Sequence, residues 1–149
     1  MSYAMIVAEI QQRLSSVENI GTIHQYLRWT RDEVEFRTRF LDGENNRLAG
    51  WEITRINVED IQDTNIANTV VHLFQLKGYL ALSDTEESEL LFQQIIDDIC
   101  AQFRPQDSLA SNCELNRPVQ FVRIDHLQFG GVLCHYAEAT IEVQEHTTS

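Results

Sequence analysis

The stretch GYLALSDTEESELLFQQIIDDICAQFRP, residues 78–105, decides the fold, because an apolar strand pattern changes within it into an amphipathic helix pattern. Its second half carries apolar residues on one broad helical stripe, namely Leu91, Phe92, Ile95, Ile96, Ile99, Cys100 and Phe103. Pro105 ends the pattern, since proline disfavours helical backbone in the residue before it. We therefore predict one main helix over about 84–104 that packs on a sheet, with Cys100 as a small core residue.

The start of this predicted helix is acidic. Ser83 and Glu86 have the three-residue spacing of a capping box, and the next pair, Asp84 and Glu87, has the same spacing. Carboxylates at a helix N-terminus gain about 0.3–1 kcal/mol each from the exposed amides and the helix dipole. A catalytic acid–base pair would instead need a dry carboxylate with a raised pKa. We therefore expect a solvated acidic face here rather than an active site.

The rest of the chain shows strand patterns after one further helix pattern. A helix over residues 3–17 is predicted by apolar residues at helical spacing, namely Ile6, Ile10, Leu14 and Val17. Strands are predicted over 22–29, 34–41, 48–58, 69–82, 119–129 and 132–143. Loops or turns are predicted at 42–46, 59–68 and 105–118, where polar residues, Gly or Pro dominate.

Three details refine this strand order. The apolar phase slips near Thr54 and Arg55, which predicts a β-bulge. Gly130 and Gly131 predict a two-residue hairpin between the last two strands. The almost unbroken apolarity of 69–82 predicts a central strand. Together the patterns predict one α+β domain over 1–149, frayed from about 145, in which an N-terminal helix and the main helix accompany an antiparallel sheet of about four to six strands.

Composition excludes some classes of protein. The chain has 149 residues, 43% of them hydrophobic, which suits one folded domain with its own core. Its net charge of −12 argues against a protein that binds nucleic acid or an anionic membrane, because both need clustered Lys and Arg. The three cysteines have no paired spacing, so we expect reduced thiols. The N-terminus lacks the pattern of a signal peptide, and no apolar run is long enough for a spanning helix.

Motifs for chemistry are missing from the sequence. The five histidines are His24, His72, His126, His135 and His146. Neither these nor the cysteines have the close spacing of a metal site, and no phosphate-binding glycine loop or nucleophile motif occurs. His126 and His135 are able to approach across the predicted hairpin, where we expect a cross-strand polar pair. We therefore predict no catalytic residue, no cofactor and no metal.

The charges are unevenly distributed along the chain. Residues 28–55 hold six arginines and six acids, whereas residues 56–103 hold nine acids and one base. One interpretation is simple solubility. The other is a head-to-tail oligomer in which the arginines of one copy meet the acids of the next, a contact that closes into a ring.

The order of elements resembles a known family. A helix entered through GYLALSDTEESE and closed by AQFRP is followed by a strand pair ending in RIDHLQFGGVLCHYAEATIEV. Over essentially the whole chain, this layout is similar to the tail-terminator (tail-completion) proteins of long-tailed bacteriophages. The resemblance implies a structural virion protein without catalytic residues, assembled in the host cytoplasm and located in the virion tail or neck. It implies a hexameric ring that caps the tail tube, stops its polymerisation and joins the tail to the head.

The resemblance also implies partners and a path for DNA. The partners would be further copies of the chain, the tail tube protein and a head-closure (stopper) or connector protein, with the tail sheath as a further candidate. Duplex DNA would pass through the ring without specific binding, past an acidic lumen. The residues that we expect to face the lumen come from Glu59, Asp60, Asp63, Asp84, Glu86, Glu87 and Glu89. Arg37 and Arg39 are the residues that we expect to pair between subunits.

Two other functions stay open from the sequence. One is a different neck or tail component, such as a head-closure or adaptor protein. The other is a small α+β domain that binds a small ligand or acts as an enzyme. The sequence does not distinguish a contractile tail from a non-contractile one.

Overall fold

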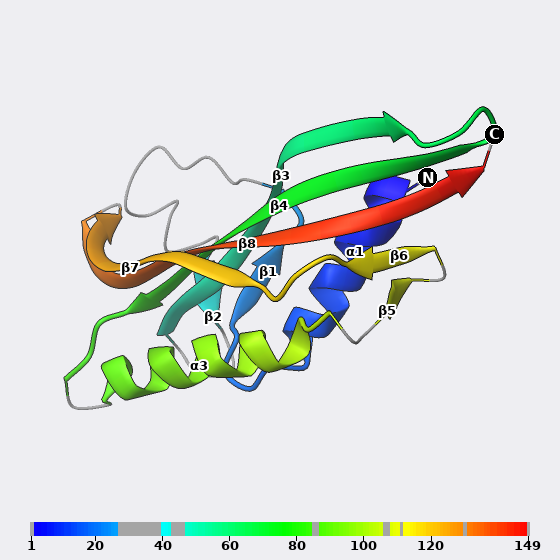
Figure 1. Cartoon of the computed structure of the whole chain (residues 1–149). Coiled ribbons are helices and arrows are strands. Elements are labelled where there is room, and N and C mark those ends of the chain that lie inside the picture. The colour runs from blue at the N-terminus through cyan, green and yellow to red at the C-terminus, as the bar shows by residue number, and fades with distance from the viewer. Residues whose placement is uncertain are drawn as a thin grey trace.

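The computed structural model describes residues 2–26, 40–42, 47–84, 87–105, 108–110, 112–129 and 131–148 (Figure 1). Most of the strand predicted over 34–41 and of the turn predicted at 42–46 lies outside these residues. Two helices are described, α1 (Ser2–Ser15) and α3 (Ser88–Gln102). The described strands are β1 (Thr22–His24), β2 (Leu41–Asp42), β3 (Arg47–Gln62), β4 (Ala67–Ala81), β5 (Ser108–Ala110), β6 (Cys113–Leu115), β7 (Gln120–Phe129) and β8 (Val132–Thr148).

The described strands form one curled sheet in the order β1-β3-β4-β8-β6-β5, with β2 paired to β3 and β7 paired to β8. The α+β class is therefore confirmed, and β4 is central, between β3 and β8. The expectation of a purely antiparallel sheet is wrong, because β1 runs parallel to β3. Residues 25–46 separate these two strands, and a parallel pair needs a connection of roughly that length, about a dozen residues or more.

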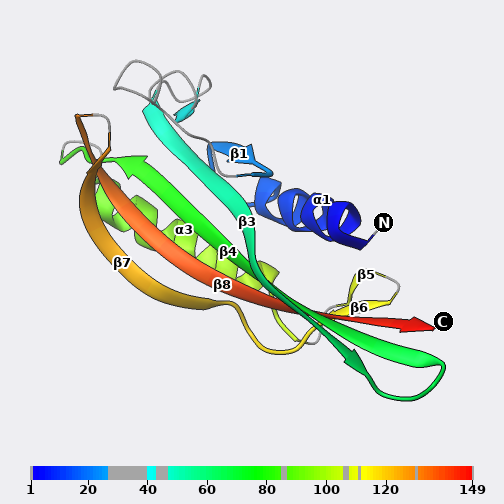
Figure 2. The same cartoon turned by 90° about the horizontal axis from the view of Figure 1, so that it is seen from above.

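Both described helices pack on the same face of the sheet (Figure 2). The predicted apolar face of α1 is buried, from Ile6 to Val17, and so are Phe92, Ile96 and Ile99 of α3. On the sheet, Trp51 lies over Gly78 of the neighbouring strand. A Cβ at Gly78 would come within 2.4 Å of the Trp51 ring, so this close approach requires glycine. One core thus joins the helices to the sheet.

The ribbon of β3, β4 and β8 continues well beyond this core (Figures 1 and 2). The predicted bulge is confirmed by a register shift between Arg55 and Asn57, and from Ile56 onward β3 is exposed. Of the loop predicted at 59–68 only 63–66 is a loop, since β3 runs to Gln62 and β4 begins at Ala67. Backbone pairing with β4, rather than side-chain burial, holds residues 57–62 of β3 in strand conformation. We call residues 56–71 the arm.

Two further predictions fail near the end of the arm. The chain end expected to fray from about 145 is strand, because β8 pairs with β4 up to Thr148. The loop predicted over 105–118 contains β5 and β6, and β6 pairs with residues 143–145 of β8. These short strands carry too few residues to show a side-chain pattern in the sequence.

The main helix starts later than predicted. α3 begins at Ser88, and Glu87 before it has a left-handed backbone, with φ of 53°, and makes no side-chain capping bond. The predicted capping box is therefore wrong for Asp84 and Glu87. Instead, the Ser88 amide at the start of α3 donates to the Ser83 carbonyl at 3.1 Å. Among the described residues, no helix is long and apolar enough to cross a membrane.

Candidate functional site

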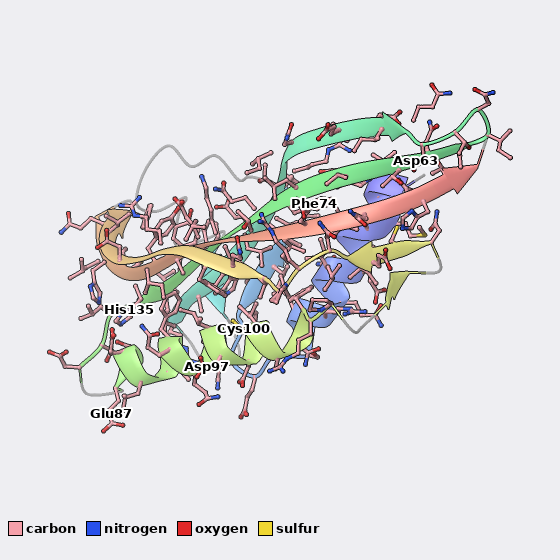
Figure 3. All side chains as sticks on the ribbon, viewed as in Figure 1. Asp63, Phe74, Glu87, Asp97, Cys100 and His135 are labelled. Atoms are coloured by element: carbon pink, nitrogen blue, oxygen red, sulfur yellow. The ribbon has the colours of Figure 1, made fainter. Side chains whose placement is uncertain are left out.

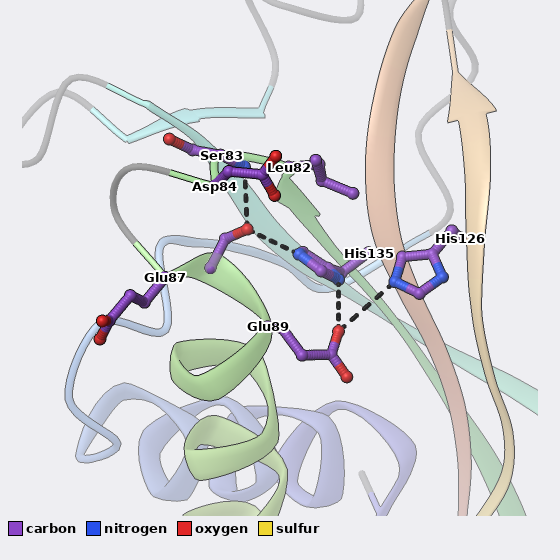
Figure 4. A pocket seen from close by; sticks show the side chains of 8 residues that line it. Leu82, Ser83, Asp84, Glu87, Glu89, His126 and His135 are labelled. Carbon is purple, nitrogen blue, oxygen red and sulfur yellow. Dashed lines mark hydrogen bonds and ion pairs between the residues drawn. The ribbon is translucent and has the colours of Figure 1, made fainter.

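A pocket of about 220 Å³ lies where the start of α3 meets the β7–β8 hairpin (Figure 4). Its lining residues come from the segment after β4, the start of α3, β7 and β8. They are Leu82, Ser83, Asp84, Glu87, Ser88, Glu89, His126 and His135. Histidine, carboxylate and hydroxyl groups thus converge at one place from four parts of the chain.

The hairpin brings the two histidines together. Phe129 pairs with Val132 across the two-glycine connection, so the predicted hairpin is confirmed, and this register sets His126 directly opposite His135. Their ring centroids are 4.9 Å apart. His135 also stacks on Phe92 of α3 at 5.5 Å, which fixes its ring against the helix. Both imidazoles therefore lie on the face of the sheet that α3 covers.

One carboxylate serves both histidines. Glu89 Oε2 lies 3.3 Å from His135 Nδ1 and 3.4 Å from His126 Nε2 (Figure 4). The Glu89 side chain is 57% exposed and the His126 side chain 52%, whereas His135 is buried. The cluster is thus open to solvent on one side and anchored in the core on the other.

Ser88 orients the buried histidine. The Ser88 Oγ lies 2.7 Å from His135 Nε2, and the Ser83 amide donates to the same oxygen at 2.8 Å. Burial and the neighbouring His126 lower the pKa of His135, and Glu89 opposes this shift. This shift favours the neutral form of His135, in which one ring nitrogen carries a proton and the other accepts a hydrogen bond.

The order serine, histidine, carboxylate is also that of a hydrolytic relay. Ser88 is poorly placed to attack a substrate, however, because its residue is only 5% exposed and its oxygen already accepts the Ser83 amide. The arrangement suits Ser88 as the residue that positions His135. The same geometry leaves Glu89, His126 and His135 as three groups that are able to hold a metal ion.

The acids expected to face a lumen lie at two opposite ends of the molecule (Figure 3). Asp84, Glu87 and Glu89 are at the pocket. The other described candidates are on the arm, where Asp60 accepts a hydrogen bond from Asn68 and Asp63 accepts one from Thr69, while Glu59 is exposed. Arg37, Arg39 and Glu86 lie outside the described residues.

The cluster was only partly visible in the sequence. The two glycines of the hairpin were enough to place His126 opposite His135. The approach of Glu89 depends on where α3 begins and how it docks, and no local pattern carries that information. The contact of Ser88 with His135 was not predicted for the same reason, since a helix that starts at residue 84 would place Ser88 inside the helix rather than at its start.

The arm presents a second surface of interest. Large apolar side chains are exposed along it, namely Ile56, Val58, Ile61 and Ile66, the last of them 67% exposed. Among the described residues, no strand pairs with the outer edge of β3 beyond Glu52. Unpaired strand edges and exposed apolar side chains both favour contact with another chain.

Comparison of the sequence with protein-family models and with curated proteins finds no match.

Proposed function

We propose that this chain is a tail-terminator subunit of a long-tailed bacteriophage. In this proposal its copies form a ring, with six as the expected number, that caps the tail tube, stops its growth and presents a surface for the head. The support for it is the layout of elements, which resembles that family, together with the α+β fold and the arm. No reaction is assigned to the chain.

The observation that carries the proposal is the arm. It extends past the core of the subunit with four large apolar side chains exposed, and exposed apolar patches mark sites of contact with other proteins. A neighbouring copy that covered these side chains, or extended the open edge of β3, would give the arm a use. Such a contact joins two different surfaces of identical subunits, which is the type of contact that closes rings.

The acidic candidates form two sets, only one of which would line the lumen of such a ring. Repulsion between carboxylates and DNA reaches only about 8 Å at physiological salt, so only acids that face the channel matter. Because the candidates lie at opposite ends of the molecule, a single lining surface holds either the arm acids or the pocket acids. Glu89 is the weakest candidate, since its carboxylate is engaged by two histidines.

The pockets argue against a domain that binds a small ligand. Sites for such ligands usually enclose about 300–1,000 Å³ and are lined mainly by apolar groups. The pocket at Glu89 holds about 220 Å³ and has polar walls. A second pocket of about 320 Å³, beside Cys100 and Arg104, opens between two prolines and has no set of converging polar groups.

Deleting the gene from the phage genome that carries it tests the proposal. We expect electron micrographs of the lysate to show tails of excessive and variable length without attached heads. Tails of normal length that fail only to join heads would favour a head-closure protein instead. Normal, infectious particles would refute the proposal.

The same proposal predicts self-association through the arm. Light scattering after size-exclusion chromatography should show a mass well above the 17.2 kDa of one chain for the wild type at high concentration. Ile66→Asp should lower that mass, because it places a charge on the exposed tip. The matched control is Val122→Asp, an exposed apolar residue on β7 away from the arm. A ring that forms only on the tail tube is tested by adding purified tubes and measuring cosedimentation.

A further inference from the structure

We propose that Glu89, His126 and His135 form a site for one zinc ion per chain. This inference does not depend on the proposed function. It rests on three ligand atoms that converge from three elements, α3, β7 and β8 (Figure 4). All three atoms lie within 4.8 Å of one another.

The distances suit a tetrahedral ion. Zinc binds imidazole nitrogen at about 2.0–2.1 Å and carboxylate oxygen at about 2.0–2.2 Å, so neighbouring ligands of a tetrahedron lie about 3.3 Å apart. Glu89 Oε2 lies 3.3 Å from one imidazole nitrogen and 3.4 Å from the other. The remaining edge, between the two nitrogens, is at most 4.8 Å long, and a rotation of the half-exposed His126 side chain would shorten it.

The buried ligand is already oriented for a metal. A histidine that binds zinc through one nitrogen usually donates its other N–H to a fixed acceptor. His135 offers Nδ1 to the site and turns Nε2 toward the Ser88 oxygen, 2.7 Å away. Ser88 is itself held by the Ser83 amide. When zinc is bound, we expect His135 Nε2–H to donate to Ser88.

The donor set and surroundings favour zinc over harder ions. Two imidazoles and one carboxylate suit zinc, whereas magnesium and calcium prefer oxygen ligands alone. The pocket beside the three ligands leaves room for a water molecule or another group in a fourth position. Because the ligands belong to α3 and to both strands of the hairpin, bound zinc would tie the start of the helix to the sheet.

The chain contains a matched control for this site. His146 and Glu114 form a similar exposed pair, with His146 Nε2 3.0 Å from Glu114 Oε1 and both side chains more than half exposed. No third ligand group joins that pair among the described residues. His146→Gln therefore removes a histidine that faces a carboxylate without touching the proposed site.

The test is calorimetric titration of the full-length, metal-stripped protein with zinc chloride. We expect the wild type and His146→Gln to bind one zinc ion per chain with equal affinity, and His126→Gln and Glu89→Gln to bind at least tenfold more weakly. Ser88→Ala should weaken binding as well, since a hydrogen-bond partner of a metal-binding histidine is worth about 10–100-fold in metal affinity. Circular dichroism verifies that each variant is folded, and His126 and Glu89 are suitable targets because both are exposed.

Cobalt provides an independent readout. Replacing zinc with cobalt should produce the strong visible absorption of a tetrahedral site in the wild type and in His146→Gln, and not in His126→Gln. The proposal is overturned if the wild type fails to bind zinc, if less than one ion binds per chain, or if His146→Gln weakens binding as much as His126→Gln.

Discussion

The two ends of the β3–β4–β8 ribbon contain the same strands but differ in what covers them. At one end, Ala49, Trp51 and Ile53 of β3 are buried under the helices. At the other, beyond the bulge at Ile56, every residue of β3 is exposed. The comparison teaches that pairing between strands is enough to shape the arm, whereas stability comes from the covered end. The arm is thus free to contact another surface.

The largest expected effect on stability comes from a substitution at the covered end, compared with one on the arm. Phe92→Ala should lower the free energy of unfolding by about 3–5 kcal/mol, because it leaves a cavity beside Trp51 and His135. Ile61→Ala on the arm should change it by about 0.5 kcal/mol or less. Urea unfolding measures both. Equal losses would show that the arm belongs to the core.

A glycine at the covered end gives the next effect. Gly78→Ala should cost about 1–3 kcal/mol, because the new methyl group would come within 2.4 Å of the buried Trp51 ring. A red shift or blue shift of tryptophan fluorescence should accompany the loss. Unchanged stability would mean that the ring shifts without cost and that the packing there is loose.

The root of the arm contains a buried polar pair. His72 Nε2 donates to Glu145 Oε1 at 3.1 Å, and Arg55 lies 3.4 Å from the other ring nitrogen of His72 and over the Tyr3 ring. His72→Ala should cost about 1–3 kcal/mol, because it leaves the buried Glu145 without this partner.

The exposed pair of His146 and Glu114 is the control for that change. His146→Ala should cost at most about 0.5 kcal/mol, since exposed ion pairs contribute little. Thermal unfolding compares the two variants. Equal losses of stability in the two variants would show that burial does not strengthen the contribution of the His72–Glu145 pair.

The smallest effect concerns the three cysteines. Burial raises the pKa of Cys113 to about 11 and that of Cys134 to about 12. Burial and the neighbouring Asp97 also raise the pKa of Cys100, which is partly exposed. Since the thiolate is the reactive form, iodoacetamide at pH 8 should label Cys100 slowly and the other two only after unfolding. Mass spectrometry of tryptic peptides checks the order. Faster labelling of Cys134 would contradict the packing of the hairpin.

Much of the covered end was predictable from the sequence, and much of the arm was not. The central position of β4 follows from its almost unbroken apolarity, and the faces of α1 and α3 follow from apolar periodicity, which directly reports burial. The bulge near Arg55 follows from a slip in that periodicity. The strand at 59–62 has no such periodicity, because both of its faces are exposed. Backbone hydrogen bonds to β4 hold this segment in strand conformation, and a side-chain pattern does not predict such bonds.

The candidate zinc site shows the same division. The pairing of His126 with His135 follows from a two-glycine hairpin, a local signal. The position of Glu89 depends on the left-handed backbone at Glu87 and on the docking of α3, both set by tertiary structure. The parallel contact between β1 and β3 likewise depends on a long connection that no local pattern determines.

The most direct test of the central claim, that the arm seats this subunit in a ring on the tail, is tail length in a phage that lacks the gene and receives a plasmid copy. Micrographs should show normal, headed tails with the wild type and with Val122→Asp, and overlong headless tails with Ile66→Asp. Normal, headed tails both with Ile66→Asp and with the double variant Ile61→Asp/Ile66→Asp would contradict the claim.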